Sequence, residues 1–257
     1  MSDTPTDADA KFARAVDRVS DWLAHLIDPD QVVELRALRV QDGTARGSGG
    51  KGDKDGSTWA GTFLGSELRE MATAGLKLSG WCQGVYYTLN PLIPSRHVRQ
   101  APRVRKAGHG ETAKDEHVLA RRWLLVDIDP VRAAGHEKDS ATEAEKARTL
   151  DLARRVREFW AGEGWPAPVL CDSGNGHHLL YKLAEPLPAE RLPVPENDRM
   201  RLLLRGLAEL FDGPDGTIDT AVFNPARIVK LPGTLACKGE ATAERPHRRA
   251  KVLEVPG

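Results

Sequence analysis

Residues 123–130 read Trp-Leu-Leu-Val-Asp-Ile-Asp-Pro, an apolar run that ends in two acids. The apolar run predicts a buried strand, and alternate residues of a strand share a face, so Asp127 and Asp129 point to the same side. Two carboxylates at the end of an apolar strand are costly unless cations neutralise them. Mg²⁺ and Mn²⁺ favour such oxygen ligands. Surface turns after strands also read D-x-D-P, so this motif alone leaves a metal site and a turn open.

The elements that follow this strand define the fold class. A capping box of Thr142 and Glu145 opens a long helix. The tight turn at 173–176 implies an antiparallel hairpin, while the long helix allows a crossover. The predicted order is strand 123–128, helix from 142, strand 168–171, strand 178–183, a Pro-rich connection 186–195, helix 200–211, irregular 222–234 and strand 251–255. This order predicts an α+β sheet with helices on one face, and an RRM-like module fits it.

The first part of the chain predicts a smaller α/β module. It comprises a disordered stretch 1–8, a helix 9–27, a strand 32–40, a mobile loop 41–56, a helix with Ser66 as its N-cap and a strand 85–89. The domain prediction is therefore an N-terminal α/β module at 9–115 and an RRM-like module at 116–257.

The turn Ser173-Gly174-Asn175-Gly176-His177-His178 is the second chemical motif. Glycines let the backbone turn tightly, and exposed amides in such a turn can cradle phosphate. The paired histidines start a strand and must face opposite ways, so only one of them can face the carboxylates. An ordinary hairpin with a structural histidine is the alternative interpretation.

The third motif places Asp219 shortly before Arg227 and Lys230. Arginine can bind a phosphate through two hydrogen bonds, and lysine acts as a point charge. The alternative for the two cations is a solvated helix face. Together, three acids, one histidine and two cations describe a two-metal site for phosphoryl transfer.

A basic stretch at 96–106 has no apolar periodicity and contains Arg99, Arg103 and Arg105. A solvated loop explains it. The alternative is a contact with the nucleic-acid backbone, which needs flexible cations and carries no base code.

Composition limits these readings. The 257 residues contain 37 basic and 37 acidic side chains, so the global charge does not favour a nucleic-acid binder. Three separated cysteines form no CxxC pair, so neither a zinc site nor a disulfide framework is expected. The polar N-terminus does not look like a signal peptide, and no apolar run approaches a membrane span. We therefore expect a cytoplasmic protein that does not contact a membrane.

The ordered set of motifs resembles the archaeo-eukaryotic primase superfamily. WLLVDIDP, PVLCDSGNGHHLLYKL and DTAVFNPARIVKLPGT look like the mobile-element primase-polymerases of phages and plasmids. Upstream, VVELRALRV and GVYYTLNPLIPSR look like the N-terminal module of the same group. The resemblance covers residues 30 to 255 and implies an RRM-like catalytic module beside an N-terminal α/β module, with the active site in the cleft between them.

The resemblance also implies roles for single residues. Asp127, Asp129 and Asp219 are expected as carboxylate ligands of two Mg²⁺ or Mn²⁺ ions, with no zinc. His178 occupies the position that contacts the phosphates of the incoming nucleotide, and Arg227 that of a triphosphate-binding residue. The expected nucleotide-binding set is Ser173, Asn175, Gly176, His178, Arg227 and Lys230. Gly176 is a departure, because many relatives carry serine there, which puts a hydroxyl contact in doubt.

The predicted function is template-directed nucleotidyl transfer by a DNA primase-polymerase in the replication of a mobile element. Its expected partners are a single-stranded DNA template, a primer strand, nucleoside triphosphates and a helicase domain or protein. Two alternatives are a repair polymerase or terminal transferase of the same superfamily, and a catalytically silent nucleic-acid-binding replication domain. The three acids speak against the silent domain, which has no need of them. The sequence leaves open the choice between ribo- and deoxyribonucleotides.

Overall fold

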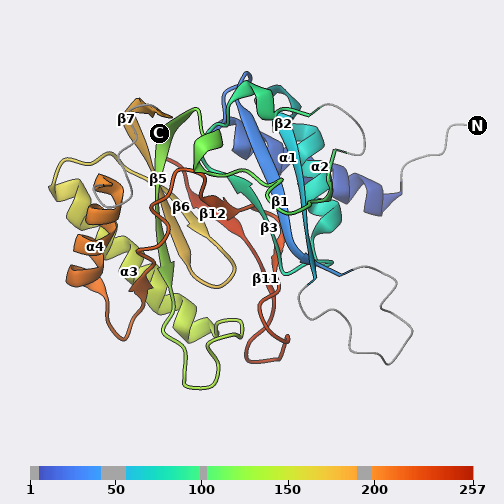
Figure 1. The fold of residues 1–257 in the computed structure, drawn as a ribbon. Helices are drawn as coiled ribbons and strands as arrows, with labels where there is room; N and C mark the ends of the chain where they lie inside the picture. Colours follow the sequence, from blue (N-terminus) through green and yellow to red (C-terminus); the bar gives the residue numbers. More distant parts are fainter. Residues whose placement is uncertain (1–5, 42–55, 99–102, 190–197, 257) are drawn as a thin grey trace, which may run out of the picture.

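The structure is a computed structural model that describes residues 6–41, 56–98, 103–189 and 198–256. Its two five-stranded sheets both consist of antiparallel pairs in the described residues. Figure 1 shows the two sheets in the middle of the molecule with helices on their outer sides. The fold is therefore a mixed α+β arrangement, which agrees with the predicted class.

The first sheet has the strand order β4-β2-β1-β3-β9. Its strands are β1 (Val32–Val40), β2 (Ser57–Leu64), β3 (Gly84–Thr88), β4 (Arg105–Lys106) and β9 (Ile228–Lys230). Two helices, α1 (Asp7–Ala24) and α2 (Leu68–Leu78), cover one face of it. The side chains of Trp22 on α1 and Tyr87 on β3 meet edge to face at 6.1 Å between ring centroids. Tyr87 therefore faces the helices, and its neighbour Tyr86 faces the uncovered side.

The second sheet has the order β12-β6-β7-β5-β8. Its strands are β5 (Ala120–Asp129), β6 (Val169–Asp172), β7 (His177–Pro188), β8 (Thr217–Ile218) and β12 (Lys251–Glu254). The helices α3 (Glu143–Gly162) and α4 (Arg199–Phe211) pack on one face, where buried Leu152, Val156 and Trp160 of α3 meet the sheet. A two-stranded ribbon of β10 (Leu235–Ala236) and β11 (Arg248–Arg249) and three short 3-10 helices at 65–67, 94–96 and 115–117 complete the described elements.

The two sheets share one hydrophobic cluster and several buried polar links. Asn90, at the end of the first sheet's β3, is 3% exposed and accepts hydrogen bonds from the backbone amides of Arg122 and Trp123 on β5. The Asn90 amide also donates to the carbonyl oxygen of Pro225. The strand β9 comes from the chain after residue 116, yet it pairs with β3 in the first sheet. These links hold the two sheets in a fixed relation.

Several sequence predictions agree with this structure. The strand at 32–40 is β1, and the hairpin around the glycine turn is the antiparallel pair β6–β7. The capping box of Thr142 and Glu145 begins α3, with Glu145 N donating to Thr142 Oγ1 at 3.1 Å.

Other predictions were wrong. The helix α1 begins at Asp7, inside the stretch predicted to be disordered, because Thr6 and Asp9 form a capping box. The predicted N-cap Ser66 lies in a 3-10 turn, and the carboxylate of Glu67 accepts from the amide of Leu64 instead. The strand β2 was not predicted, since its sequence STWAGTFL lacks a clear alternation. Residues 1–5 and 42–55 lie outside the described residues.

Two further corrections concern the second half of the chain. The strand β7 continues to Pro188, into the predicted Pro-rich connection, because it pairs with the start of β5 as far as Ala120. The stretch predicted to be irregular at 222–234 contains β9. Its three residues are too few for a period to be seen in the sequence, and the pairing partner β3 is remote in the chain.

Candidate functional site

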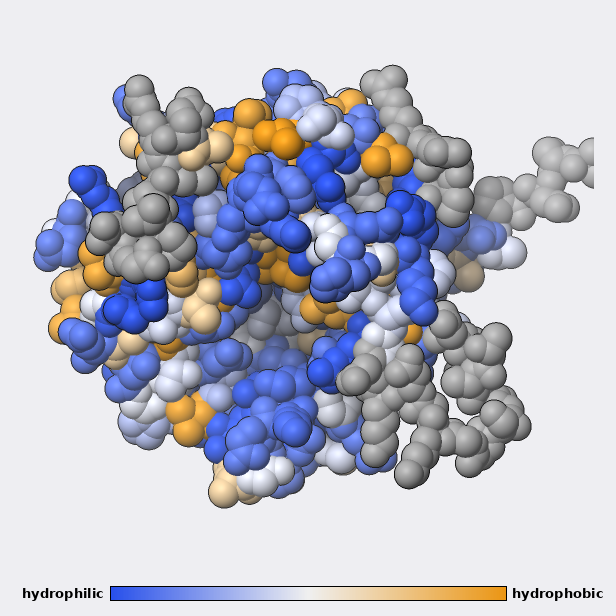
Figure 2. All heavy atoms as spheres, viewed as in Figure 1, coloured by the Kyte–Doolittle hydropathy of each residue, from blue (hydrophilic) through white to orange (hydrophobic). Residues whose placement is uncertain are grey.

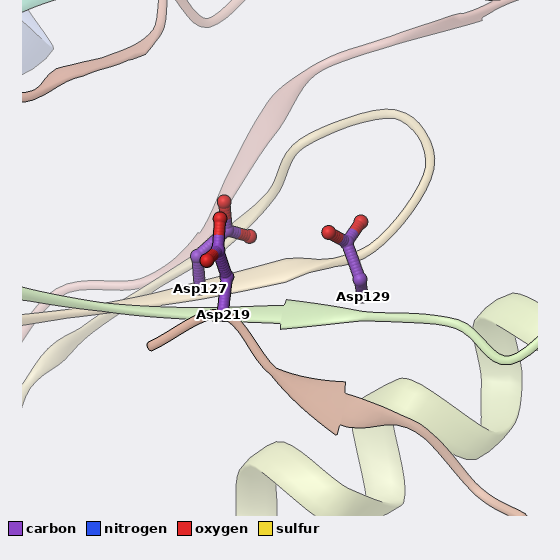
Figure 3. A group of neighbouring side chains, drawn as sticks. All are labelled: Asp127, Asp129 and Asp219. Atoms are coloured by element: carbon purple, nitrogen blue, oxygen red, sulfur yellow. The ribbon is translucent and has the colours of Figure 1, made fainter. Parts of the chain in front are cut away.

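The three predicted acids lie together at the end of β5. Asp127 and Asp129 are the last alternate residues of β5, and Asp219 follows β8, which pairs with β5 at Ile128 and Asp129. The amide of Asp219 donates to the carbonyl oxygen of Asp127 at 2.9 Å, which holds the segment of Asp219 next to β5. One ligand atom from each carboxylate lies within 4.8 Å of the others. Figure 3 shows the three carboxylates on the same side of β5.

The electrostatics of this group favour a cation. Burial and then the charge of Asp127 raise the pKa of Asp129 to about 6. Within the described residues, no lysine or arginine forms a salt bridge with Asp127, Asp129 or Asp219. Carboxylates that converge without a cation repel one another. The oxygen-only donor set suits Mg²⁺ or Mn²⁺, so the residues present fit the expected metals.

The two histidines of the turn separate, as the strand alternation predicts. His178 pairs with Asp127 in the sheet register, and its Nε2 lies 3.4 Å from Asp127 Oδ1. His177 points to the helix face, where its Nδ1 lies 2.8 Å from Thr149 Oγ1 on α3. Burial lowers the pKa of His177 to about 4. Burial alone acts to lower the pKa of His178 as well, but the charge and hydrogen bond of Asp127 outweigh it, so the pKa of His178 is raised.

A pocket of about 270 Å³ lies beside the acids, between the uncovered faces of the two sheets. Figure 2 shows a hollow near the middle of the molecule, with hydrophilic side chains around it. The lining residues come from both sheets, from the two-stranded ribbon and from the loops next to these strands: Gln83, Tyr86, Asp127, Asp129, Arg132, Ser173, Asn175, His178, Lys230, Ala236, Cys237 and Lys238. We call this hollow the acid pocket.

Lys230 is the predicted cation that the fold brings into the acid pocket. It is 6% exposed, and its Nζ has no hydrogen-bond partner in the described part of the chain. Its Nζ lies 4.8 Å from the centroid of the Tyr86 ring, and burial lowers its pKa to about 8. A buried ammonium without a partner is costly, so Lys230 is suited to an anionic ligand.

Arg227 does not line the acid pocket. It lines a small separate cavity, and its Nη2 donates to the carbonyl oxygen of Ala221 at 2.6 Å. The amide of Ala221 in turn donates to Asp219 Oδ1 at 2.8 Å. Arg227 therefore holds the loop that carries Asp219, which is a positioning contact.

Packing and backbone geometry explain why the turn at 173–176 contains two glycines. A Cβ on Gly176 would lie 2.2 Å from the carbonyl oxygen of Ile128, and Gly174 has a φ of +94°. Ser173 Oγ accepts from the amide of Gly176 at 3.0 Å, and Asn175 Oδ1 accepts from the amide of Ala141 at 2.9 Å. Ser173 and Asn175 line the acid pocket, while Gly176 is needed for the close approach of the turn to β5.

Sequence reasoning missed several residues of the acid pocket. Arg132 and Lys238 add two cations, and buried Nε and Nη2 atoms of Arg132 have no hydrogen-bond partner among the described residues. Tyr86 lies in the predicted strand 85–89, but no role in the site was predicted for it. Arg132 stands three residues after Asp129, which is the one sequence signal that could have found it. Lys238 and Tyr86 reach the site through sheet pairing and a remote loop, so no local pattern marks them.

The basic stretch is partly fixed by ion pairs. Arg103 Nη2 donates to Glu67 Oε1 at 2.7 Å, and Arg105 Nη1 donates to Glu111 Oε2 at 3.2 Å. Arg99 lies outside the described residues. None of the helices in the described ranges is long and apolar enough to cross a membrane.

Comparisons with known proteins give one structural similarity. No family model matches the chain, and no curated protein matches it. Among solved structures, the chain is similar to the polymerase domain from Mycobacterium tuberculosis Ligase D in complex with DNA. The TM-score is 0.46, and the identity is 12% over 96% of this chain and 86% of that chain.

Proposed function

We propose that the chain is a metal-dependent nucleotidyltransferase that extends nucleic acid on a template, as a primase-polymerase of a mobile element. The observation that carries this proposal is the convergence of Asp127, Asp129 and Asp219 within 4.8 Å, without a lysine or arginine partner in the described residues. The order of the three motifs, which resembles the primase superfamily, supports the same activity.

The strand arrangement supports an RRM-like catalytic module. The elements β5-α3-β6-β7-α4-β8 follow a β-α-β-β-α-β order, and their spatial order is β6-β7-β5-β8. In this proposal the uncovered face of the module carries the acids, and the first sheet forms the opposite wall of an active-site cleft. Tyr86 and Lys230 from the first sheet, which line the acid pocket, support the cleft.

The charges of the acid pocket suit a metal-bound triphosphate. The three acids provide the ligands, and two divalent ions, when bound, neutralise them and stabilise charge on the attacking and leaving oxygens. Lys230, Arg132 and Lys238 offer cations for the outer phosphates. His178, beside Asp127, can donate a hydrogen bond to a phosphate oxygen. Ser173 and Asn175 shape the turn that faces this space.

The proposed reaction joins a 3′-hydroxyl to an incoming nucleotide. The hydroxyl oxygen bonds to the α-phosphorus, the bond from this phosphorus to the bridging oxygen of the β-phosphate breaks, and pyrophosphate leaves. The proton of the hydroxyl passes to solvent. The chain's own contribution is to orient the triphosphate between Lys230 and His178 and to hold Asp219 in place through Arg227 and Ala221.

The test is synthesis on single-stranded DNA, with and without a primer, with ribo- or deoxyribonucleoside triphosphates and Mg²⁺ or Mn²⁺. Products without a primer, lost in the Asp127→Asn and Asp129→Asn double variant, support the primase-polymerase. If products form only when a primer is present, the chain is a repair polymerase and not a primase. If products form without a template, the chain is a terminal transferase. DNA binding without any product in all these reactions would overturn the enzymatic proposal.

A further inference from the structure

A second hollow, of about 580 Å³, lies at the edge of the first sheet. The strand β2 provides its floor through Ala60, Gly61 and Thr62. The segment that crosses this strand provides its walls through Ser95, Arg96, Val98, Arg103, Arg105, Ala107 and Glu111, and Glu34 of β1 also lines it. We call it the arginine pocket. It is larger than the acid pocket and shares no lining residue with it.

Two arginines of this pocket have spare donors. Nε of Arg96 and Nη1 of Arg103 are buried and have no hydrogen-bond partner in the described ranges. Both side chains are 26% exposed, so each side chain is partly accessible. Unpaired buried donors are costly and rare in folded proteins. A guanidinium carries five N–H groups in a planar fork that matches the oxygens of a phosphate.

The acids near these arginines are not equally available. Glu34 is buried and is held by Arg36 and by the amide of Ala113, and its Oε2 lies 4.0 Å from Nη2 of Arg96. Glu67 accepts from Arg103, outside the pocket lining. Glu111 is different, because its side chain is 47% exposed and its carboxylate accepts from Arg105 at 3.2 Å. Glu111 is therefore an internal anion that an incoming phosphate can displace.

The arginine pocket and the acid pocket lie on the same face of the first sheet. Directly paired residues run across all five strands in the register Lys230, Tyr86, Arg36, Ala60 and Arg105. Such partners in antiparallel strands share a face. With strands about 4.8 Å apart, this row spans about 19 Å from Lys230 to Arg105. It begins at the lining of the acid pocket and ends at that of the arginine pocket.

We propose that the arginine pocket binds a phosphate group of the nucleic-acid strand, at a distance of several nucleotides from the acid pocket. The inference rests on the proposed function, because that function places a strand in the acid pocket. The ligand chemistry is a phosphate ester, which comes either from an internal phosphodiester of the strand or from a terminal phosphate. Arg96 and Arg105 contact it, and Glu111 competes with it.

The test is equilibrium binding of a labelled single strand of about 12 nucleotides, long enough to cover both pockets. Metal and nucleotides are left out. We expect Arg96→Gln to weaken binding about tenfold and to lower the salt slope by about one. Glu111→Gln should tighten binding. Arg154→Gln is the matched control, since Arg154 lies on α3 and pairs with Asp151. Unchanged affinity in both Arg96→Gln and Glu111→Gln would overturn the proposal. Glu111→Gln retains all the arginines, so it still tests the pocket if Arg96→Gln fails to fold.

Two further experiments distinguish an internal phosphate from a terminal one, and the arginine-pocket proposal from the proposed enzymatic function. An equal loss for 5′-phosphorylated and 5′-hydroxyl strands in Arg96→Gln supports an internal phosphodiester, and a loss confined to the phosphorylated strand supports a terminal phosphate. The Asp127→Asn and Asp129→Asn variant should keep the effect of Arg96→Gln. If wild type makes no product but Arg96→Gln still weakens binding, only the proposed enzymatic function fails. If wild type makes product and neither pocket variant changes binding, only the arginine pocket fails.

Discussion

Strand β5 carries charged side chains at both ends. Those at its start form salt bridges between arginine and aspartate, whereas the acids at its end have no lysine or arginine salt-bridge partner in the described residues. Near the start, Arg121 is 1% exposed and forms two hydrogen bonds with Asp198, at 3.0 and 2.8 Å. At the end, Asp127 and Asp129 converge with Asp219 without a lysine or arginine partner in the described residues. The charge at the start of β5 is therefore paired inside the fold. The charges at its end have no such partner and are available to bind a ligand.

The largest expected effect is on catalysis at the unpaired end. Changing Asp127 and Asp129 to Asn should reduce nucleotide incorporation by about a thousandfold or more, since metal stabilisation of the transition state is worth several kcal/mol. Incorporation per folded molecule is the measurement. A folded double variant that incorporates nucleotides at the wild-type rate would show that these acids are not the metal ligands.

The next effect is on stability at the paired end. Arg121→Met should lower the free energy of unfolding by about 3–5 kcal/mol, because it leaves Asp198 buried without its partner. Urea denaturation measures this loss. The control is Arg122→Gln, the adjacent residue, which pairs with Asp28 at the surface and should cost about 1 kcal/mol or less. Equal losses in the two variants would remove the contrast between the ends of β5.

The buried pair of Glu145 and Arg245 predicts how the free energy of unfolding changes at low pH. Burial raises the pKa of Glu145, but hydrogen bonds and charge from Arg245 outweigh it, and the pKa is lowered to about 2. The pKa is lower in the folded state, so this stability is present above the ordinary value of about 4.5 and is lost as pH falls towards 2. The loss should reach about 3 kcal/mol. Denaturation at several pH values should show a smaller dependence in Glu145→Gln, and an equal dependence would contradict the assignment.

The smallest effect separates the two histidines. His178→Ala should lower kcat/KM about tenfold to a hundredfold, as expected for one hydrogen bond to a charged phosphate. His177→Ala should lower the melting temperature through its lost contact with Thr149, while activity per folded molecule stays near wild type. Steady-state kinetics and thermal melts on both variants measure the difference. If His177→Ala has the larger kinetic effect, the wrong histidine has been assigned to the pocket.

Local patterns in the sequence were enough to predict that Asp127 and Asp129 lie on one side of a strand and that the two histidines face opposite ways. The apolar run before Asp127 fixes a strand, and the period of two then places Asp127 and Asp129 together and separates His177 from His178. The capping box at Thr142 is equally local, so it too was predicted correctly.

The pairing of strands that are remote in the chain was not predicted, although Lys230 itself was named as a nucleotide-binding residue. Lys230 enters the acid pocket because β9 pairs with β3, more than a hundred residues earlier in the chain. Tyr86 faces the acid pocket because it alternates along β3 with Tyr87, which faces the helices. Arg227, predicted to bind the triphosphate, lines a separate small cavity, where its Nη2 donates to the Ala221 carbonyl oxygen. The arginine pocket depends on Thr62 of β2, a strand that the sequence pattern did not indicate.

Thermal melting with added Mg²⁺ or Mn²⁺ measures whether Asp127, Asp129 and Asp219 hold a metal. At a metal concentration of about 100 times Kd, binding should add about 2.7 kcal/mol, which raises the wild-type melting temperature by roughly 5–10 °C. The Asp127→Asn and Asp129→Asn variant should melt at or above the wild-type temperature without metal, because repulsion is relieved, and should show no shift with metal. Equal metal shifts in both proteins, or a variant that melts well below wild type without metal, would contradict the account.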